Sequence, residues 1–303
     1  MVVLGRFAPS PSGRMHLGNA LSAMLAWLSA KSRGGEIVLR IEDLDPARSR
    51  EEHAQKIMED FLWLGLTWDR RSENQSRRES VYNEALESLR DMGLVYPCYC
   101  SRGELHAASA PHASDGRVIY GGTCRNLTEE ARRQKTKAPA WRLMLPEETV
   151  SFVDGLQGPQ AMNLQRENGD IIVRRADGVA AYQLAVVVDD AAAGVTEVVR
   201  GRDLLTSTPT QIYLYRLLGK EPPAFYHVPM LLAPDGRRLS KRDGDLDFSV
   251  LREKYAPQEI IGLLAFLCGL IPRWEKVSVQ ELVQDFSWEK ICPGDITVDT
   301  EKI

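Results

Sequence analysis

Long apolar runs, an export signal and a surplus of basic residues are all missing from this sequence. No segment reaches the roughly 18 uncharged apolar residues that a membrane helix needs. The first ten residues, MVVLGRFAPS, have no basic region followed by an apolar stretch. These absences argue against a membrane-spanning or secreted protein, and we expect a cytoplasmic one that has no membrane contact.

Cysteine and net positive charge are also scarce. The five cysteines are an odd number in a long chain without an export signal, which argues against a disulfide framework. The net charge of −4 gives no overall attraction to nucleic acid. Residues 125–142 nevertheless form a basic run, which is either a solvated helix face or a place where phosphates bind. Its basic residues are Arg125, Arg132, Arg133, Lys135, Lys137 and Arg142, against Glu129 and Glu130.

The apolar pattern of the first 45 residues is that of a βαβ unit. Residues 2–8 predict a short strand, apolar residues recur at helical spacing from Leu17 to Leu28, and EIVLRIEDLD predicts a second strand. Such units build parallel sheets whose ligands sit at the carboxyl ends of the strands. We therefore expect Arg6–Asn19 and Glu42 to face the same crevice.

The rest of the sequence predicts alternating helices and strands, interrupted by an insertion. Helices are predicted at about 50–65, 76–93 and 207–219, and strands at QLAVVVDD, TEVVRGRD and HVPMLL. The last 50 residues read as helical and then irregular. The predicted fold is α/β with a parallel sheet, divided at 1–96 (first half of the sheet domain), 97–175 (insertion), 176–250 (second half) and 251–303 (helical remnant).

The stretch RFAPSPSGRMHLGNA has the outline of a phosphate-binding corner. A loop rich in Pro, Ser and Gly precedes a helix, whose free N–H groups and dipole attract phosphate, and His16 can donate a ring N–H. Gly18 would let a ligand approach the backbone. The loop lacks the lysine of a GxxxxGK[ST] motif, and taken singly it is equally a plain helix start.

A second basic loop, RRLSKRDG, holds Lys241 between Arg238 and Arg242. It follows an apolar strand, where a cation could stabilise charge that develops on transferring phosphate. Alone, it also fits an ordinary exposed loop.

Together, the two stretches resemble the HIGH and KMSKS signatures of class I aminoacyl-tRNA synthetases. The spellings RFAPSPSGRMHLGN, LRIEDLDPARS and RRLSKRDG are those of the glutamyl subgroup, which also uses HLGN and LSKR variants. The resemblance implies a Rossmann-like catalytic domain that makes glutamyl-adenylate from L-glutamate and ATP with Mg²⁺. It also implies that Lys241 is the cation absent from the first loop.

The resemblance assigns roles residue by residue. His16 and Lys241 would be catalytic. The implied ATP contacts are His16, Gly18, Asn19 and Lys241. The implied glutamate contacts are Arg6, Phe7, Ala8, Pro9, Ser10, Glu42, Tyr182 and Arg200, with Glu42 receiving the α-ammonium and Arg200 gripping a carboxylate.

Cys98, Cys100 and Cys124 predict a metal site in the insertion. Three thiolates suit zinc, and a closed tetrahedral site needs a fourth ligand. By ligand frequency this would be His106 or His112, and three free cysteines without metal are the plain alternative. The resemblance implies one structural Zn²⁺ held by Cys98, Cys100, Tyr120 and Cys124, with His112 as the fallback.

The length of the chain after the second signature bears on the acceptor. A full glutamyl-tRNA synthetase carries a further helical anticodon-binding region of well over a hundred residues, whereas this sequence stops at Ile303. This resembles shortened paralogues, with only a stem-contact remnant, that transfer glutamate to queuosine in the anticodon loop of tRNA(Asp). The alternatives are an ordinary synthetase charging tRNA(Glu), truncated or partnered, and a silent zinc- and tRNA-binding paralogue. We expect a monomer.

Overall fold

The computed structural model describes residues 2–101, 103–104, 119–237, 239 and 247–299. Arg238, Lys241 and Arg242 of the second signature lie outside the described residues. The candidate zinc ligands His106 and His112 lie outside them as well.

A parallel sheet forms the centre of the molecule. It contains β1 (Leu4–Phe7), β2 (Glu36–Leu39), β3 (Arg70–Arg71), β9 (Glu197–Gly201) and β10 (Ala224–Val228). Strands β1, β2 and β3 pair in that order, and β9 pairs with β10, all in parallel. Thr196, just before β9, donates its backbone N–H to the carbonyl of Leu4 at 3.0 Å, which sets β9 beside β1. The predicted α/β fold with a parallel sheet is confirmed.

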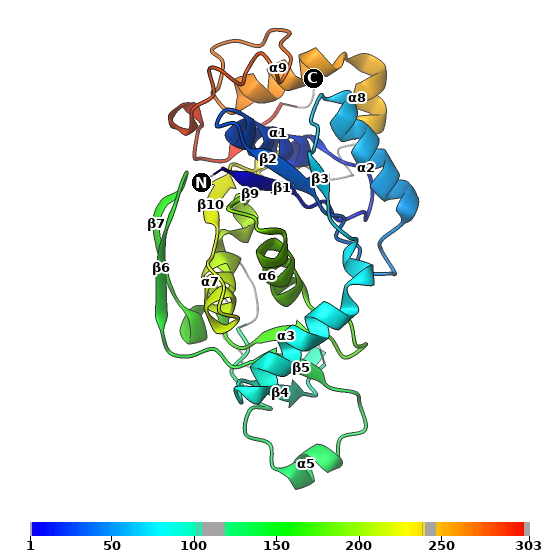
Figure 1. Ribbon diagram of the computed structural model, residues 1–303, viewed down its shortest axis with the longest axis vertical. Coiled ribbons are helices and arrows are strands. Elements are labelled where there is room, and N and C mark those ends of the chain that lie inside the picture. Colours follow the sequence, from blue (N-terminus) through cyan, green and yellow to red (C-terminus); the bar gives the residue numbers. More distant parts are fainter. Residues whose placement is uncertain (1, 102, 105–118, 238, 240–246, 300–303) are drawn as a thin grey trace.

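Helices cover both faces of this sheet (Figure 1). One face is covered by α1 (Leu17–Lys31), α2 (Glu51–Trp63) and α9 (Pro257–Leu267), and the other by α6 (Tyr182–Ala193) and α7 (Thr208–Leu217). Each face has its own hydrophobic core, so the strand ends are held between two packed layers. Among the described residues, no helix has the length and apolar character to cross a membrane.

The prediction of a strand at QLAVVVDD is wrong, because these residues lie in α6. Leu184 to Asp190 are all buried, so the helix has no polar face and shows no helical period. A short apolar run of this kind cannot be told from a buried strand by pattern alone. The helix ends at Gly194, which has the left-handed φ of 72° that favours glycine.

The region from Val95 to Arg174 is mostly antiparallel. It contains β4 (Val95–Cys98), β5 (Ala140–Leu143) and β8 (Ile171–Arg174) in one sheet, the hairpin β6 (Thr149–Asp154) and β7 (Gly158–Asn163), and the short α5 (Glu129–Arg133). A hydrogen bond joins the hairpin to the central sheet: Gly155 donates its N–H to the carbonyl of Phe225 in β10 at 2.8 Å. Only glycine fits there, since a Cβ would lie 2.0 Å from the Tyr226 ring.

Four further elements complete the described fold outside the short 3-10 and π turns. They are α3 (Glu79–Asp91), α8 (Phe248–Lys254), β11 (Leu231–Leu232) and β12 (Ile296–Thr297). HVPMLL thus spans the end of β10 and a separate short strand that pairs with β12. Helix α8 begins a few residues after the second signature, and Phe248 donates its N–H to the carbonyl of Met15 in the first signature at 3.3 Å.

Candidate active site

Arg6 begins a cluster of buried charges at the carboxyl ends of β1, β2 and β9. Its side chain is only 6% exposed, and its Nε lies 3.4 Å from Oδ2 of Asp190. Its Nη1 donates to the carbonyl of Val199 at 3.3 Å. Because Asp190 comes from α6 and Val199 from β9, Arg6 joins the strand that carries the first signature to two distant parts of the chain.

Arg40, directly after β2, is the most buried member of this cluster, at 1% exposed. Its Nη2 donates to Oε1 of Glu42 at 2.9 Å, and its Nη1 lies 2.5 Å from Oδ1 of Asp190. Burial disfavours its charge, but Asp190, Glu42 and Asp189 outweigh that effect and raise its pKa. Burial raises the pKa of Glu42, although Arg40 opposes the shift. The sequence analysis did not identify Arg40, Asp189 or Asp190 as members of the site. The only local signal was that the two aspartates end the apolar run QLAVVVDD.

Arg200 projects from β9 and has neutral partners. It is 5% exposed, its Nε donates to Nε2 of His227 at 3.0 Å, and its Nη2 donates to Oγ1 of Thr208 at 2.8 Å. No carboxylate of the described residues forms an ion pair with it. Burial lowers its pKa, with Tyr182 and Arg6 the next influences. Arg200 is therefore a buried cation whose immediate protein contacts carry no negative charge.

Tyr182 opens α6 and is 37% exposed. Burial of its hydroxyl raises its pKa, and Arg200, Glu42 and Arg6 are the next charges to act on it. The structure therefore brings four of the sequence-predicted residues, Arg6, Glu42, Tyr182 and Arg200, together from four separate segments. We call Arg6, Arg40, Glu42, Asp190 and Arg200 the charge cluster.

The loop after β1 lies next to the charge cluster. The backbone N–H of Glu42 donates to the carbonyl of Pro9 at 3.0 Å, so the loop and Glu42 are held together. Ala8 and Pro9 are half-buried and Ser10 is exposed. The side chain of Phe7 instead lies in the core, 2% exposed and 4.7 Å from the Phe61 ring between centroids. A contact from residue 7 to a ligand could therefore come only from its backbone.

His16 caps the N-terminus of α1. Its backbone N–H donates to Oδ1 of Asn19 at 3.2 Å. A Cβ at Gly18 would lie 3.3 Å from Cε1 and Nδ1 of the imidazole, so glycine leaves that ring room. His16 also forms a β-bridge with Asp247, which follows the second signature. The first signature therefore touches the described segment that follows the second.

Asp60 is a second buried charge in this region. Its side chain is 0% exposed and lies between Arg14 of the first signature at 3.2 Å and Arg252 of α8 at 2.8 Å. Both arginines are partly exposed. This carboxylate is therefore paired with two cations of the protein, although burial still raises its pKa.

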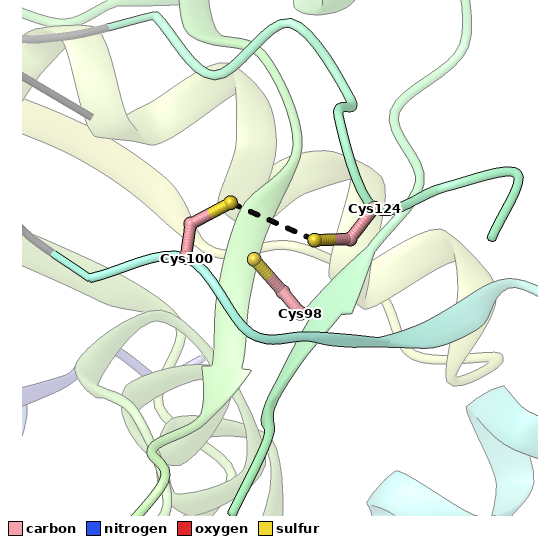
Figure 2. A group of neighbouring side chains, drawn as sticks. All are labelled: Cys98, Cys100 and Cys124. Atoms are coloured by element: carbon pink, nitrogen blue, oxygen red, sulfur yellow. Dashed lines mark hydrogen bonds between the residues drawn. The ribbon is translucent and has the colours of Figure 1, made fainter. Parts of the chain in front are cut away.

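Three cysteines converge at the end of β4 (Figure 2). The Sγ atoms of Cys98, Cys100 and Cys124 lie within 4.8 Å of one another, and those of Cys100 and Cys124 are 3.6 Å apart. The Tyr120 hydroxyl oxygen is 3.4 Å from Sγ of Cys98. In tetrahedral zinc sites two sulfurs are about 3.7 Å apart, and a sulfur and an oxygen about 3.5 Å. The three cysteines could thus hold a metal ion, and we call them, together with Tyr120, the thiol cluster.

A guanidinium covers the thiol cluster. Arg142, 6% exposed, lies over the Tyr120 ring with its Cζ 3.8 Å from the centroid, and its Nη1 donates to the carbonyl of Asp170 at 2.5 Å. The carboxylate of Asp170 accepts from Arg125 Nε at 3.0 Å. Two residues of the basic run, Arg125 and Arg142, therefore point inward, and only the others remain candidates for an exposed basic face.

Comparison with known proteins identifies the family. Residues 2–303 match the family described as tRNA synthetases class I (E and Q), catalytic domain. Glutamyl-Q tRNA(Asp) synthetase of Symbiobacterium thermophilum is 48% identical over 317 residues, covering 100% of this chain and 98% of that protein. The protein of that name from Nitratidesulfovibrio vulgaris is 51% identical, covering 89% and 88%. A solved structure, glutamate tRNA ligase from Elizabethkingia meningosepticum in complex with its amino acid, has a TM-score of 0.84 at 28% identity, covering 100% of this chain and 68% of that one. The chain therefore belongs to the class I tRNA synthetases of the E and Q group and, within it, to the glutamyl-Q tRNA(Asp) synthetase family.

Proposed function

We propose that the protein activates L-glutamate with ATP and transfers the glutamyl group to queuosine in the anticodon loop of tRNA(Asp). The observation that carries the first step is Arg200, a buried guanidinium without an ion-paired carboxylate among the described residues, which lies with Glu42 around Tyr182. A cation and an anion held in one cluster match an amino acid that carries a side-chain carboxylate and an α-ammonium.

Glutamate binds with its two ends separated. Arg200 takes the side-chain carboxylate and Glu42 takes the α-ammonium, while Arg6 and Tyr182 lie beside both groups. The loop of Phe7, Ala8, Pro9 and Ser10 contributes mainly backbone groups, because Phe7 is committed to the core. Arg40 and Asp190 keep Glu42 and Arg6 in place.

ATP, as its magnesium complex, binds at the N-terminus of α1 against His16, Gly18 and Asn19. An oxygen of the glutamate α-carboxylate attacks the α-phosphorus, the bond to the β-phosphate oxygen breaks, and pyrophosphate leaves. Lys241 and His16 stabilise the negative charge that develops, so the step needs positioning and electrostatics rather than a protein nucleophile. A ring hydroxyl of queuosine then attacks the glutamyl carbonyl and releases AMP.

One structural Zn²⁺ is held by Cys98, Cys100, Tyr120 and Cys124. The support is that the three thiols lie within 4.8 Å of one another and that the Tyr120 hydroxyl lies 3.4 Å from Sγ of Cys98. The ion would fix the segment between β4 and β5, which belongs to the insertion at 97–175. The catalytic halves at 1–96 and 176–250 then supply the sheet, and 251–303 supplies a stem-contact remnant. We infer a monomer that acts in the cytoplasm, where tRNA is charged.

The acceptor is tested by incubating the protein with ATP, labelled glutamate and purified tRNA. Label should enter tRNA(Asp) that carries queuosine and should not enter tRNA(Asp) without it. Charging of tRNA(Glu) would replace this proposal with an ordinary glutamyl-tRNA synthetase activity, as in the solved relative. Absence of glutamate-dependent pyrophosphate exchange, with and without tRNA, would instead indicate a silent paralogue. A Lys241→Ala variant, expected to lose exchange by orders of magnitude, is the control for the enzyme's own activity.

A further inference from the structure

Arg200 is the end of a buried chain of hydrogen bonds that crosses three elements. Asp154 at the end of β6 lies 2.6 Å from Nδ1 of His227 in β10, and Nε2 of His227 lies 3.0 Å from Nε of Arg200 in β9. The exposed fractions are 1% for Asp154, 0% for His227 and 5% for Arg200. Water therefore does not compete for these contacts, and each bond must have one donor and one acceptor.

The Asp154 end determines the direction of every bond in the chain. Its carboxylate also accepts backbone N–H groups of Leu156 at 3.0 Å and Gln157 at 2.8 Å, contacts that favour the ionised form. An ionised carboxylate accepts only, so Nδ1 of His227 carries the proton. In a neutral ring Nε2 is then a pure acceptor, which is what the Nε–H of Arg200 requires.

The result is a guanidinium held in one plane. Nε2 of His227 accepts from Nε of Arg200, and Oγ1 of Thr208 accepts from Nη2 of Arg200 at 2.8 Å. The Thr208 hydroxyl oxygen also lies 3.1 Å from Nε2 of His227. His227 and Thr208 both accept hydrogen bonds from Arg200. The opposite edge of the guanidinium therefore presents only N–H donors to a ligand. A carboxylate satisfies such donors in pairs, whereas the NH₂ of a carboxamide would face them donor to donor.

We propose that Asp154 and His227 are positioning residues that orient Arg200 toward the side-chain carboxylate of glutamate and thereby set the preference for glutamate over glutamine. The proposal rests on the proposed function of Arg200. It also gives the β6–β7 hairpin, which sequence patterning assigned to the insertion, a part in amino-acid selection.

The test reverses the direction of these hydrogen bonds by changing Asp154, the residue that sets it. In Asp154→Asn, a side-chain NH₂ can donate to Nδ1, which moves the ring proton to Nε2 and sets it against the Nε–H of Arg200. We expect the KM for glutamate to rise about tenfold or more, the KM for ATP and kcat to change less than about threefold, and discrimination against glutamine to fall in pyrophosphate exchange. An unchanged KM for glutamate in the folded variant would overturn the proposal.

A matched pair at His227 separates positioning from packing. Gln places an amide oxygen where Nε2 lies and can still accept from Arg200, whereas Asn places its amide near Nδ1 and keeps only the Asp154 contact. Glutamate affinity should be largely retained in His227→Gln and lost in His227→Asn, although both remove the same ring. Equal losses in the two variants would mean that the histidine serves only to fill space.

The wild-type protein supplies a measurement that needs no variant and no activity. Nitrogen-15 NMR should find His227 neutral and protonated at Nδ1, and a proton at Nε2 would refute the chain of bonds. A wild-type protein with this tautomer but without glutamate activation would refute the proposed function alone. Activation with unchanged glutamate KM in Asp154→Asn would refute this inference alone.

Discussion

The charge cluster and the thiol cluster are both buried groups of reactive side chains, and their internal balance differs. In the charge cluster, Arg6 and Arg40 face Asp190 and Glu42, while the hydrogen bonds of Arg200 go to neutral groups, among them His227 and Thr208. In the thiol cluster every member is a potential metal donor, and one cation, Arg142, lies over the face of Tyr120 and also acts on the Cys98 thiol. On the proposed function, the first would hold an anionic ligand and the second a metal cation.

Asp60 shows what a balanced buried charge looks like beside these two. It is fully buried, yet two arginines of the same chain compensate it. Burial of a charge alone therefore indicates no ligand. The informative feature is a charge, or a set of donors, that the surrounding protein does not complete.

Replacing Arg200 should give the largest effect. In Arg200→Gln, the side-chain carboxylate of glutamate loses its buried cation, and kcat/KM for glutamate in pyrophosphate exchange should fall about 10³-fold. Arg202→Gln is the matched control, because Arg202 is 37% exposed and pairs with Asp295 on the surface. If the two variants kept similar glutamate kinetics, the charge cluster would not be the amino-acid site.

Removing the charge of Asp60 tests the balanced case. Asp60→Asn leaves Arg14 and Arg252 without their carboxylate and should lower the free energy of unfolding by about 3 kcal/mol, measured by urea denaturation. Glu87→Gln, which breaks an exposed pair with Arg90, should change it by less than about 0.5 kcal/mol. The KM for glutamate should stay near the wild-type value in both variants. A large rise in Asp60→Asn would contradict the distinction between a buried charge that the protein pairs and one that binds a ligand.

Removing a thiol tests the other half of the comparison. Cys124→Ser should lower zinc affinity at least about 100-fold, because losing a ligand costs more than losing an outer-shell partner. Zinc content and thermal unfolding measure the change, and Cys292→Ser, which alters an exposed cysteine outside the cluster, is the control. Glutamate-dependent pyrophosphate exchange should persist in both variants. Full zinc content in Cys124→Ser would contradict the assigned ligand set.

The two clusters also differ in how far the sequence reveals them. Cys98, Cys100 and Cys124 are close in the chain, so their spacing alone predicts a shared site. The charge cluster joins residues from Arg6 to Arg200. The βαβ pattern predicted that Arg6 and Glu42 face one crevice, whereas Arg200 was predicted only through the resemblance of its motif. The bonds between them depend on tertiary packing that no local pattern records.

Arg40 and the Asp154–His227 pair mark the limit of that prediction. Arg40 sits in a run that reads as strand, and nothing local indicates that its side chain is buried. Asp189 and Asp190 were placed at a strand end, whereas they lie on α6 and reach the cluster from a helix. The α/β pattern was predictable because it depends on local periodicity, but the partners of each buried charge were not.

The smallest expected effect concerns the pH dependence of glutamate binding. Glu42 must be ionised to take the α-ammonium, and burial raises its pKa above the usual range of a glutamate. As the pH falls toward that raised pKa, the protonated fraction of Glu42 grows, so the KM for glutamate should rise several-fold between about pH 7 and about pH 5.5. Burial lowers the pKa of His227, so that ring stays neutral over the same range and leaves Arg200 in place. The KM for ATP, measured in the same series, is the internal control. A glutamate KM that stays flat down to about pH 5 would show that Arg40 offsets the burial of Glu42 completely.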